Sequence, residues 1–360
     1  MKNLIVVLLL SLIVIAGLNS CSQCNKPKQA AQVTTTDTSA NAKIMAVNEE
    51  IKKDSLNPLL YYKRAHIYDH NDDLKSAITD MFFVLSLDSM RPEFYLYAAE
   101  LFKKSGEPKK GIALMDKAIV VDSTNTDLYV KAAELAYIDT TIKGNYLLAL
   151  KYLNAAILKN PQNADIYFYK GNVFKEMRDT AKAISSFQTA TELNPKFYNA
   201  YVQLGLLLAQ KKNKNAEKYL DNAIKVSDKP EDALYAKANI IKETALALQD
   251  ANKDAPAIDK FNEAIETYKK VIEVNYKNVE SYMGIAFSYY QMDSVEQAYK
   301  YYSLATKIEP TYAGAYFSKG LCAEDLGRKR EAMDLYQTCL NIDPKFVRAQ
   351  EHLKKLQPTP

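Results

Sequence analysis

Residues 311–344 read TYAGAYFSKGLCAEDLGRKREAMDLYQTCLNIDP, and residues 278–310, directly before them, read NVESYMGIAFSYYQMDSVEQAYKYYSLATKIEP. Each stretch has an aromatic residue, a small residue four positions later, an alanine twelve further on, a large residue four beyond it, a small residue three later, and a closing proline. The pattern returns every 34 residues from Pro58 onward. A fixed period of this length predicts one elongated array of repeated units rather than two or three unrelated domains.

The register of this pattern divides residues 58–346 into eight repeats. They begin at Pro58, Pro92, Thr126, Ala164, Tyr198, Glu231, Val279 and Ala313. Position 4 of each repeat carries a large residue: Tyr61, Tyr95, Tyr129, Tyr167, Tyr201, Leu234, Tyr282 and Tyr316. Position 8 is always alanine or glycine: Ala65, Ala99, Ala133, Gly171, Gly205, Ala238, Ala286 and Gly320. Prolines close four of the repeats: Pro161, Pro195, Pro310 and Pro344.

These positions resemble the tetratricopeptide repeat (TPR), a family whose unit is two antiparallel helices with a bulky residue at position 4, small residues at 8, 20 and 27, and proline at 32. The resemblance implies an all-α fold, a right-handed superhelical α-solenoid of about eight helix-turn-helix repeats with capping helices. Glycine within a helix costs about 1 kcal/mol relative to alanine, so Gly171, Gly205 and Gly320 would be poor choices unless two helices approach closely there. The tyrosines at position 4 are expected to be core residues.

Three repeats depart from the common length. The third has four extra residues around 140–145, and the fifth is one residue short near 211–215. The sixth, residues 231–278, carries fourteen extra residues, which predicts an elongated hairpin whose helices run on past the array with residues 254–256 at the tip. A neutral insertion and an element that docks a partner are both open readings of this hairpin.

The two ends of a stacked array expose apolar surface and need covering elements. Residues 42–57 are expected to form an N-terminal capping helix. Residues 347–360, which begin with the polar stretch VRAQEHLKKLQ, are expected to form a C-terminal capping helix and tail.

An apolar run of fifteen residues, 4–18, follows Lys2 at the start of the chain. A membrane-spanning helix needs about 20 such residues, whereas the core of a signal peptide needs about 7 to 15. The length therefore favours a cleaved signal peptide at residues 1–20. A conventionally cleaved secreted protein and an uncleaved anchor are the alternatives to the lipoprotein described next.

The run ends in Leu18-Asn19-Ser20-Cys21, which resembles the bacterial lipobox. The resemblance implies that Cys21 becomes the lipid-modified N-terminus of a bacterial TPR lipoprotein. Residues 21–41 lack apolar periodicity and are rich in small polar groups, as expected of a flexible lipidated tether. Serine rather than aspartate after the cysteine resembles the signal for the outer membrane of a Gram-negative cell.

Composition argues against several classes of function. The 47 basic and 43 acidic residues give a net charge of +4 without a polybasic block, so no nucleic-acid partner is expected. No Gly-rich phosphate loop, nucleophile elbow or paired-cysteine metal motif occurs, so we expect no enzyme, no cofactor and no small-molecule substrate. Cys322 and Cys339 lie in one repeat, where a disulfide and two buried thiols are both possible.

One cluster of residues could carry chemistry. His66 and His70 are four residues apart on one helix face, a spacing at which two histidines can share a zinc ion. Ile67 stands where a zinc protease would need a glutamate, and no third ligand is fixed by the sequence. The alternatives are a metal site and exposed polar residues at a helix end.

The family resemblance places the partner-binding surface on the concave face, lined by positions 2, 5, 9, 12 and 13 of the first helices. The partner-binding residues that we expect are Tyr62, His66, Glu100, Glu134, Phe168, Asn172, Tyr235, Asn239, Met283, Phe287, Tyr290, Phe317 and Leu321. The lining changes from acidic and polar in repeats one to three to apolar and aromatic in seven and eight. This apolar strip either binds an extended peptide or helix or packs against the interior of the superhelix itself.

Chaperone-binding members of the family hold a C-terminal carboxylate with lysine at position 5 and asparagine at position 9. Phe168 and Tyr235 stand in place of the lysines that would accompany Asn172 and Asn239, so this clamp is not predicted.

The function expected from these features is a membrane-anchored scaffold or adaptor in the cell envelope. Its partners would be proteins or peptide segments of envelope proteins, and its contact with the membrane would be the lipid on Cys21. A metal-binding or enzymatic envelope protein that uses His66 and His70 is one alternative. A self-associating structural component of the envelope is another.

Overall fold

A computed structural model of the protein describes residues 38–139 and 145–357. These two ranges contain eighteen helices and no strands, so the predicted all-α solenoid is confirmed. Residues 1–37, with the signal peptide, Cys21 and most of the expected tether, lie outside the described residues, as does most of the insertion at 140–145. In the described part no helix combines the length and the apolar character that crossing a membrane requires.

Sixteen helices form eight antiparallel pairs. The first helices of the pairs are α2 (Pro58–His70), α4 (Pro92–Lys104), α6 (Thr126–Ile138), α8 (Ala164–Glu176), α10 (Tyr198–Gln210), α12 (Glu231–Asp250), α14 (Val279–Gln291) and α16 (Ala313–Asp325). The second helices are α3 (Leu74–Leu87), α5 (Pro108–Val121), α7 (Asn145–Lys159), α9 (Thr180–Leu193), α11 (Ala216–Val226), α13 (Asp254–Val274), α15 (Val295–Ile308) and α17 (Lys329–Ile342). Each first helix begins at the residue from which the sequence register counts.

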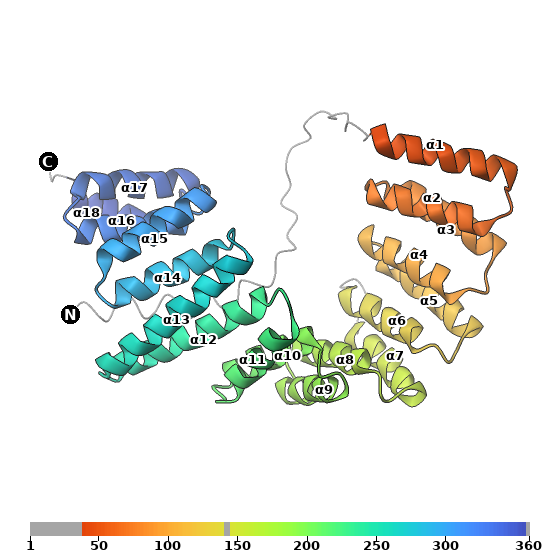
Figure 1. The fold of residues 1–360 in the computed structure, drawn as a ribbon, viewed down its shortest axis with the longest axis horizontal. Helices are drawn as coiled ribbons and strands as arrows, with labels where there is room; N and C mark the ends of the chain where they lie inside the picture. The colour runs from red at the N-terminus through yellow and green to blue at the C-terminus, as the bar shows by residue number, and fades with distance from the viewer. Residues whose placement is uncertain (1–37, 140–144, 358–360) are drawn as a thin grey trace.

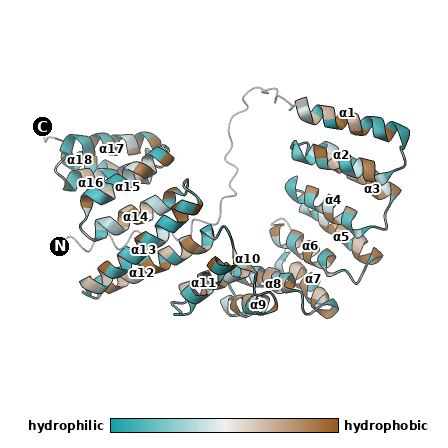
Figure 2. Cartoon of the chain, viewed as in Figure 1, coloured by the Kyte–Doolittle hydropathy of each residue, from teal (hydrophilic) through white to brown (hydrophobic). Residues whose placement is uncertain are grey.

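The pairs follow one another along an arc, with α1 (Thr38–Lys53) at one end and α18 (Val347–Leu356) at the other (Figure 1). The first helices α2, α4 and α6 lie on the inner side of this curve, and their partners α3, α5 and α7 lie outside them. Most helices carry both hydrophobic and hydrophilic residues, as expected of helices that bury one side (Figure 2). The first helices therefore supply the concave face.

Glycines at position 8 receive large side chains from the second helix of the same pair. A Cβ atom added to Gly171 would lie 2.7 Å from the ring of Phe187, and one added to Gly320 would lie 2.6 Å from the ring of Tyr336. Phe187 and Tyr336 are fully buried. The expected close approach of the two helices is thus a ring packed directly on a backbone that has no side chain.

The turns inside the repeats share one backbone feature at position 15, or its equivalent in the elongated repeat. The residue there has φ between 52° and 75° in every described turn of this kind: Asp72, Gly106, Arg178, Lys212, Asn252, Asp293 and Gly327. Only two of these seven residues are glycine, although this region of φ favours glycine. Three of the other five are aspartate or asparagine, which adopt this region more readily than other side chains, and the remaining two are Arg178 and Lys212.

The capping helices differ slightly from expectation. Helix α1 begins at Thr38, four residues before the predicted start at 42, so it includes residues assigned to the tether. It buries Ala40 and Val47. At the other end, α18 begins at Val347 as predicted and buries Ala349.

The elongated hairpin of repeat six differs in two ways. Its tip is the turn at 251–253, and the residues predicted for the tip form the first turn of α13, where proline is tolerated because no intrahelical N–H bond is lost. The hairpin also does not project freely. Phe287 and Met292 of the next repeat pack against Ala245 of α12 and against Ala257 and Phe261 of α13.

Candidate functional site: the concave face

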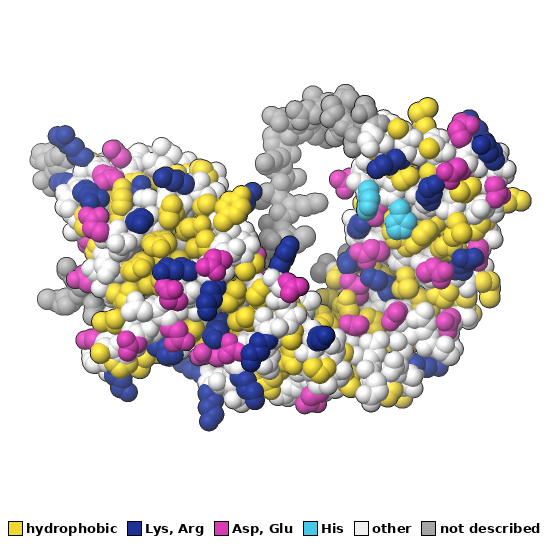
Figure 3. Space-filling model, in the orientation of Figure 1, with side chains coloured by type: hydrophobic (Ala, Val, Ile, Leu, Met, Phe, Trp, Pro, Cys, Tyr) yellow, Lys and Arg dark blue, Asp and Glu magenta, His cyan; other side chains and the backbone are white. Residues whose placement is uncertain are grey.

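The structure places all thirteen predicted partner-binding residues on first helices. Twelve of them are half-buried, and Phe317 is buried with 3% of its surface exposed. Figure 3 shows charges of both signs intermixed over repeats one to three, whereas hydrophobic side chains gather over α12 to α16. The two ends of the concave face therefore differ in chemical character.

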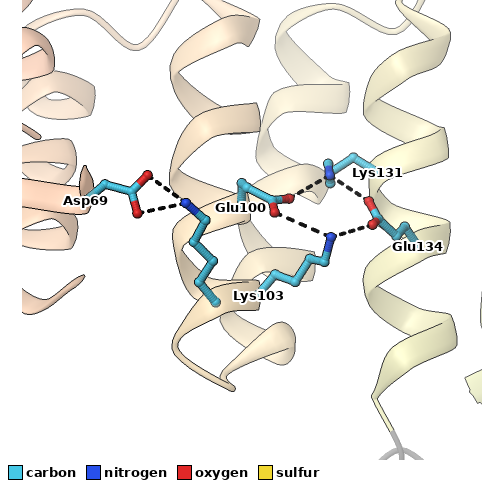
Figure 4. A network of polar contacts seen from close by, with 6 residues as sticks. Asp69, Glu100, Lys103, Lys131 and Glu134 are labelled. Carbon is cyan, nitrogen blue, oxygen red and sulfur yellow. Dashed lines mark hydrogen bonds and ion pairs between the residues drawn. The ribbon is translucent and has the colours of Figure 1, made fainter. Parts of the chain in front are cut away.

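Four charged side chains of alternating sign join α4 to α6 on the concave face (Figure 4). The Nζ atom of Lys131 donates to Glu100 at 2.9 Å and to Glu134 at 2.6 Å. The Nζ atom of Lys103 lies 2.7 Å from a carboxylate oxygen of Glu134 and 3.4 Å from one of Glu100. Each carboxylate thus faces two ammonium groups, and each ammonium group faces two carboxylates.

Burial by itself raises the pKa of Glu100, but hydrogen bonds and charges from Lys131 and Lys103 outweigh it, and the pKa lies below its ordinary value. Burial likewise lowers the pKa of Lys131, and its bonds to Glu100 and Glu134 raise it to a net value above the ordinary one. Glu100, Lys103 and Lys131 are therefore held in their charged forms. The predicted acidic character of this region is wrong in one respect, because the acids are neutralised by lysines of the same face.

A second ion pair links α2 to α4. The Nζ atom of Lys104 donates to both carboxylate oxygens of Asp69, at 2.8 and 2.7 Å (Figure 4). The hydroxyl of Tyr97 donates to Asp69 at 3.2 Å. Burial, and then the charge of Asp69, raises the pKa of Tyr97. The carboxylate of Asp69 on α2 thus accepts hydrogen bonds from two side chains of α4 and joins the first two repeats.

His66 is part of an aromatic stack. Its ring lies parallel to that of Tyr97 with centroids 4.0 Å apart, and the ring of Tyr62 meets it edge-on at 4.6 Å. Burial lowers the pKa of His66, as expected of an imidazole held between rings. His70 is exposed, and residues 38–139 and 145–357 contain no group of three or more ligating side chains placed to hold a metal ion. The structure brings no third ligand to the predicted histidine pair.

A cavity of about 510 Å³ lies beside this stack, between α1 and α2. Its lining is Lys43, Ala46, Val47, Lys63, His66 and Ile67.

The centre of the face is lined by Phe168, which packs against Phe187 and Phe197 with centroids 5.8 and 4.9 Å away. Lys175, also on α8, donates to the side-chain oxygen of Gln203 at 3.0 Å. Burial lowers the pKa of Lys175. Asn172 is half-buried on the same helix.

A polar group sits among aromatic rings on α12. The hydroxyl of Tyr268 donates to the side-chain oxygen of Asn239 at 2.7 Å, and the Nζ atom of Lys242 donates to the same oxygen at 3.2 Å. The ring of Tyr235 lies 6.0 Å from that of Tyr268, and the ring centroid of Phe287 lies 5.8 Å from the Nζ atom of Lys242. Asn239 and Phe287 thus contact one lysine, and Tyr235 packs against the tyrosine that shares Asn239 with it.

Phe317 corrects the predicted binding strip. Its ring packs against Phe346 and Tyr336, with centroids 5.0 and 5.7 Å away, and the guanidinium of Arg348 lies 4.7 Å from its centroid. His352 of α18 closes the ring edge at 5.7 Å. The capping helix and the residues before it occupy the place that a ninth repeat would take, so Phe317 is core and unavailable to a partner.

The remaining predicted residues of the strip, Met283, Tyr290 and Leu321, are half-buried. The hydroxyl of Tyr290 donates to Asp325 at 2.7 Å and so joins repeat seven to repeat eight. Leu321 packs beside Phe317 in the last repeat.

Lys103, Lys131 and Lys242 are functional candidates that the sequence reading missed. Lys103 and Lys242 occupy position 12, which the family register itself assigns to the concave face, so the register was the signal for both. Lys131 occupies position 6 and could not be found in this way. The partners of all three depend on the stacking of neighbouring helices.

Cys322 and Cys339 are free thiols, each fully buried. Burial raises the pKa of Cys322 to about 12 and that of Cys339 to about 11, so neither forms a thiolate at neutral pH.

A family model described as the tetratricopeptide repeat matches residues 164–197, 279–312 and 313–346. A TPR repeat-containing protein of Methanocaldococcus jannaschii is 25% identical over 58% of this chain and 51% of its own length. A probable UDP-N-acetylglucosamine–peptide N-acetylglucosaminyltransferase SPINDLY of Solanum lycopersicum is 32% identical over 26% of this chain and 10% of its own length. The chain thus spans between a tenth and about half of these relatives.

Among solved structures, the C-terminal part of a TPR repeat-containing protein from Cytophaga hutchinsonii is similar, with a TM-score of 0.49 and 21% identity over 69% of this chain and 95% of that one. The three matches to the family model begin at Ala164, Val279 and Ala313, the residues at which α8, α14 and α16 begin. This protein is therefore an all-α solenoid in which three of the repeats, residues 164–197, 279–312 and 313–346, match the tetratricopeptide repeat.

Proposed function

We propose that this protein is a membrane-anchored scaffold of the cell envelope that holds protein partners on its concave face. Tetratricopeptide repeats generally serve as protein-interaction scaffolds. The observation that carries the proposal here is the row of half-buried aromatic and apolar side chains on α12, α14 and α16, with Met283 and Phe287 at its centre. Half-buried apolar side chains on a concave surface suit an extended segment or a helix of another protein.

The charged end of the face supports the same choice of binding region. Glu100, Lys103, Lys131 and Glu134 satisfy one another, so a partner that replaced these contacts would gain little. The apolar end gains from being covered, because removing apolar surface from water stabilises a complex by about 25 cal/mol per Å² before the costs of association.

The membrane anchor rests on the sequence alone. The apolar run at 4–18 and the cysteine that follows it support lipidation at Cys21, and two or more acyl chains suffice for stable anchoring. The segment between Cys21 and α1 would let the array reach away from the membrane surface. Outer-membrane placement and partners among envelope proteins are parts of the same proposal.

The test is recovery of cross-linked partners from membranes of the native cell with the full-length protein. We expect specific envelope proteins to co-purify with the wild type and to be reduced with Phe287→Ser. Phe82→Ser is the matched control, because Phe82 is 53% exposed on the second helix α3. Circular dichroism must show that both variants keep their helices. Equal recovery with all three proteins would contradict the assignment of the concave face.

The anchor is tested separately by cell fractionation. Cys21→Ser removes the acceptor of the lipid, and we expect the variant to leave the membrane fraction with its helical content unchanged. Retention of the variant in membranes would instead indicate an uncleaved anchor.

A further inference from the structure

Lys242 is a lysine that the fold buries on the partner-binding side of the molecule. It lies at position 12 of repeat six, on the helix that also carries Tyr235 and Asn239, and only 8% of its surface is exposed. A buried ammonium group needs partners that replace its lost water. The contacts around Lys242 are therefore informative.

Those contacts are incomplete. An ammonium group has three N–H donors. Within the described part of the chain, the Nζ atom of Lys242 makes one hydrogen bond, at 3.2 Å, to the side-chain oxygen of Asn239, which Tyr268 already holds at 2.7 Å. The nearest carboxylate oxygen belongs to Glu243 at 3.6 Å, and the side chain of Glu243 is about half exposed to water. Burial accordingly lowers the pKa of Lys242.

Other lysines on the same face show what a satisfied ammonium looks like in this protein. Lys131 donates to two carboxylates, at 2.9 and 2.6 Å. Burial lowers its pKa, but these two contacts raise the pKa above the ordinary value. Lys103 likewise reaches Glu134 at 2.7 Å. Lys242 is more deeply buried than either of these lysines and has weaker anionic contacts.

The surroundings of Lys242 define the ligand. The ring of Phe287 lies on one side, and Tyr235 and Asn239 lie on the same helix face one turn or two away. A single cation in an apolar setting interacts strongly with a single negative charge, because the local dielectric constant is low. A phosphate would need several donors, and the contacts described around Lys242 include no second cation.

We propose that Lys242 binds a carboxylate of the segment that occupies the concave face, while Phe287 and Tyr235 pack against an apolar side chain next to that carboxylate. This rests on the proposed function and specifies its ligand as an acidic, partly apolar protein segment. The carboxylate would come from a glutamate or aspartate side chain or from the C-terminus of the partner.

The test uses the full-length protein in detergent and an array of synthetic twelve-residue peptides with aromatic and acidic residues. Each peptide is made in four forms: with glutamate, with glutamine in its place, with a free C-terminus, and with an amidated C-terminus. We expect bound peptides to lose affinity by about tenfold or more when the contributing carboxylate is neutralised, as is typical of a hydrogen bond to a charged group. The sensitive form identifies the source of the carboxylate.

Lys242→Met should remove this preference and bind the glutamate and glutamine forms equally. Lys300→Met, which removes an exposed lysine on α15, should keep it. Binding that depends on Phe287 but not on peptide charge or on Lys242 would overturn the carboxylate site and leave the proposed function intact. Peptide binding that survives Phe287→Ser unchanged would overturn both.

Thermal unfolding without peptide gives an independent readout. Lys242→Met should unfold at a higher temperature than the wild type, because it removes a buried charge while Tyr268 still satisfies Asn239. A lower unfolding temperature would show that Lys242 serves the stability of the fold and would contradict its retention for a ligand.

Discussion

At the scale of single residues, glycines at position 8 determine whether the two helices of a repeat can pack. The ring of Tyr336 is fully buried against Gly320, and its hydroxyl donates to Glu324 at 2.7 Å. The ring is therefore held at both ends and cannot move aside for a methyl group. Gly171 likewise faces a fully buried ring, that of Phe187.

Gly320→Ala should destabilise the last repeat by about 1–3 kcal/mol, the usual effect of overpacking a core. Its new Cβ atom would lie 2.6 Å from the ring of Tyr336. Gly314→Ala is the control on the same helix, because the nearest atom would be 3.7 Å away and alanine is favoured over glycine in a helix by up to about 1 kcal/mol. Urea denaturation measures both, and equal stability of the two variants would contradict the packing described.

At the scale of helices, α18 shows how one capping element closes the array. The Nδ1 atom of His352 lies 2.9 Å from the carboxylate of Glu324 on α16, and the same carboxylate oxygen accepts from Tyr336. Phe317 lies beneath the ring of His352. The contact between His352 and Glu324 therefore holds α18 over the ring of Phe317, which the sequence assigned to the binding surface.

Acid should loosen this contact. Burial raises the pKa of Glu324, but the hydrogen bonds of His352 and Tyr336 lower it more, and the net pKa is below the ordinary value of 4.5. A carboxyl whose pKa is depressed by folding contributes stability above its unfolded pKa, and that stability is lost as the pH falls through the lower folded pKa.

Hydrogen exchange of residues 347–357 checks this expectation between about pH 6 and about pH 3, after correction for intrinsic exchange rates. The wild type should lose more protection on acidification than Glu324→Gln, whose side chain does not titrate. A variant with the same loss as the wild type would exclude Glu324 as the source of the effect.

At the scale of the whole molecule, each repeat touches mainly its neighbours, so damage in the middle should remain local. Phe187 lies on α9 and is fully buried, and it contacts Phe168 and Gly171 of α8. Its loss would affect the two repeats around it more than either end of the arc in Figure 1.

Phe187→Ala should destabilise the centre by about 3–5 kcal/mol, as is typical of large cavities. Hydrogen exchange followed by mass spectrometry should show α8 to α11 opening while α2 to α5 and α14 to α17 keep their protection. Leu158→Ala, at a site 86% exposed on α7, is the control and should change little. Uniform loss of protection along the chain would indicate a single cooperative unit.

The sequence by itself determined the all-α class and the register of the repeats. Each first helix begins where the pattern of large residue, small residue and proline places it, for instance at Ala164 and Val279. Burial inside one helix pair recurs every 34 residues, so the spacing of core residues records it directly. The same register also placed twelve of the thirteen predicted binding residues at half-buried positions on the first helices.

Only the tertiary structure decided which of these residues are available and which charges remain unpaired. Glu100 meets Lys131 from the next repeat and Phe317 is covered by α18, whereas Phe287 stays half-buried beside the hairpin of repeat six. The burial of Lys242 with a single hydrogen bond from its Nζ atom is also set by how the helices around it pack. These contacts depend on how one repeat is set against the next, and a periodic pattern fixes the interior of a repeat without fixing that relation.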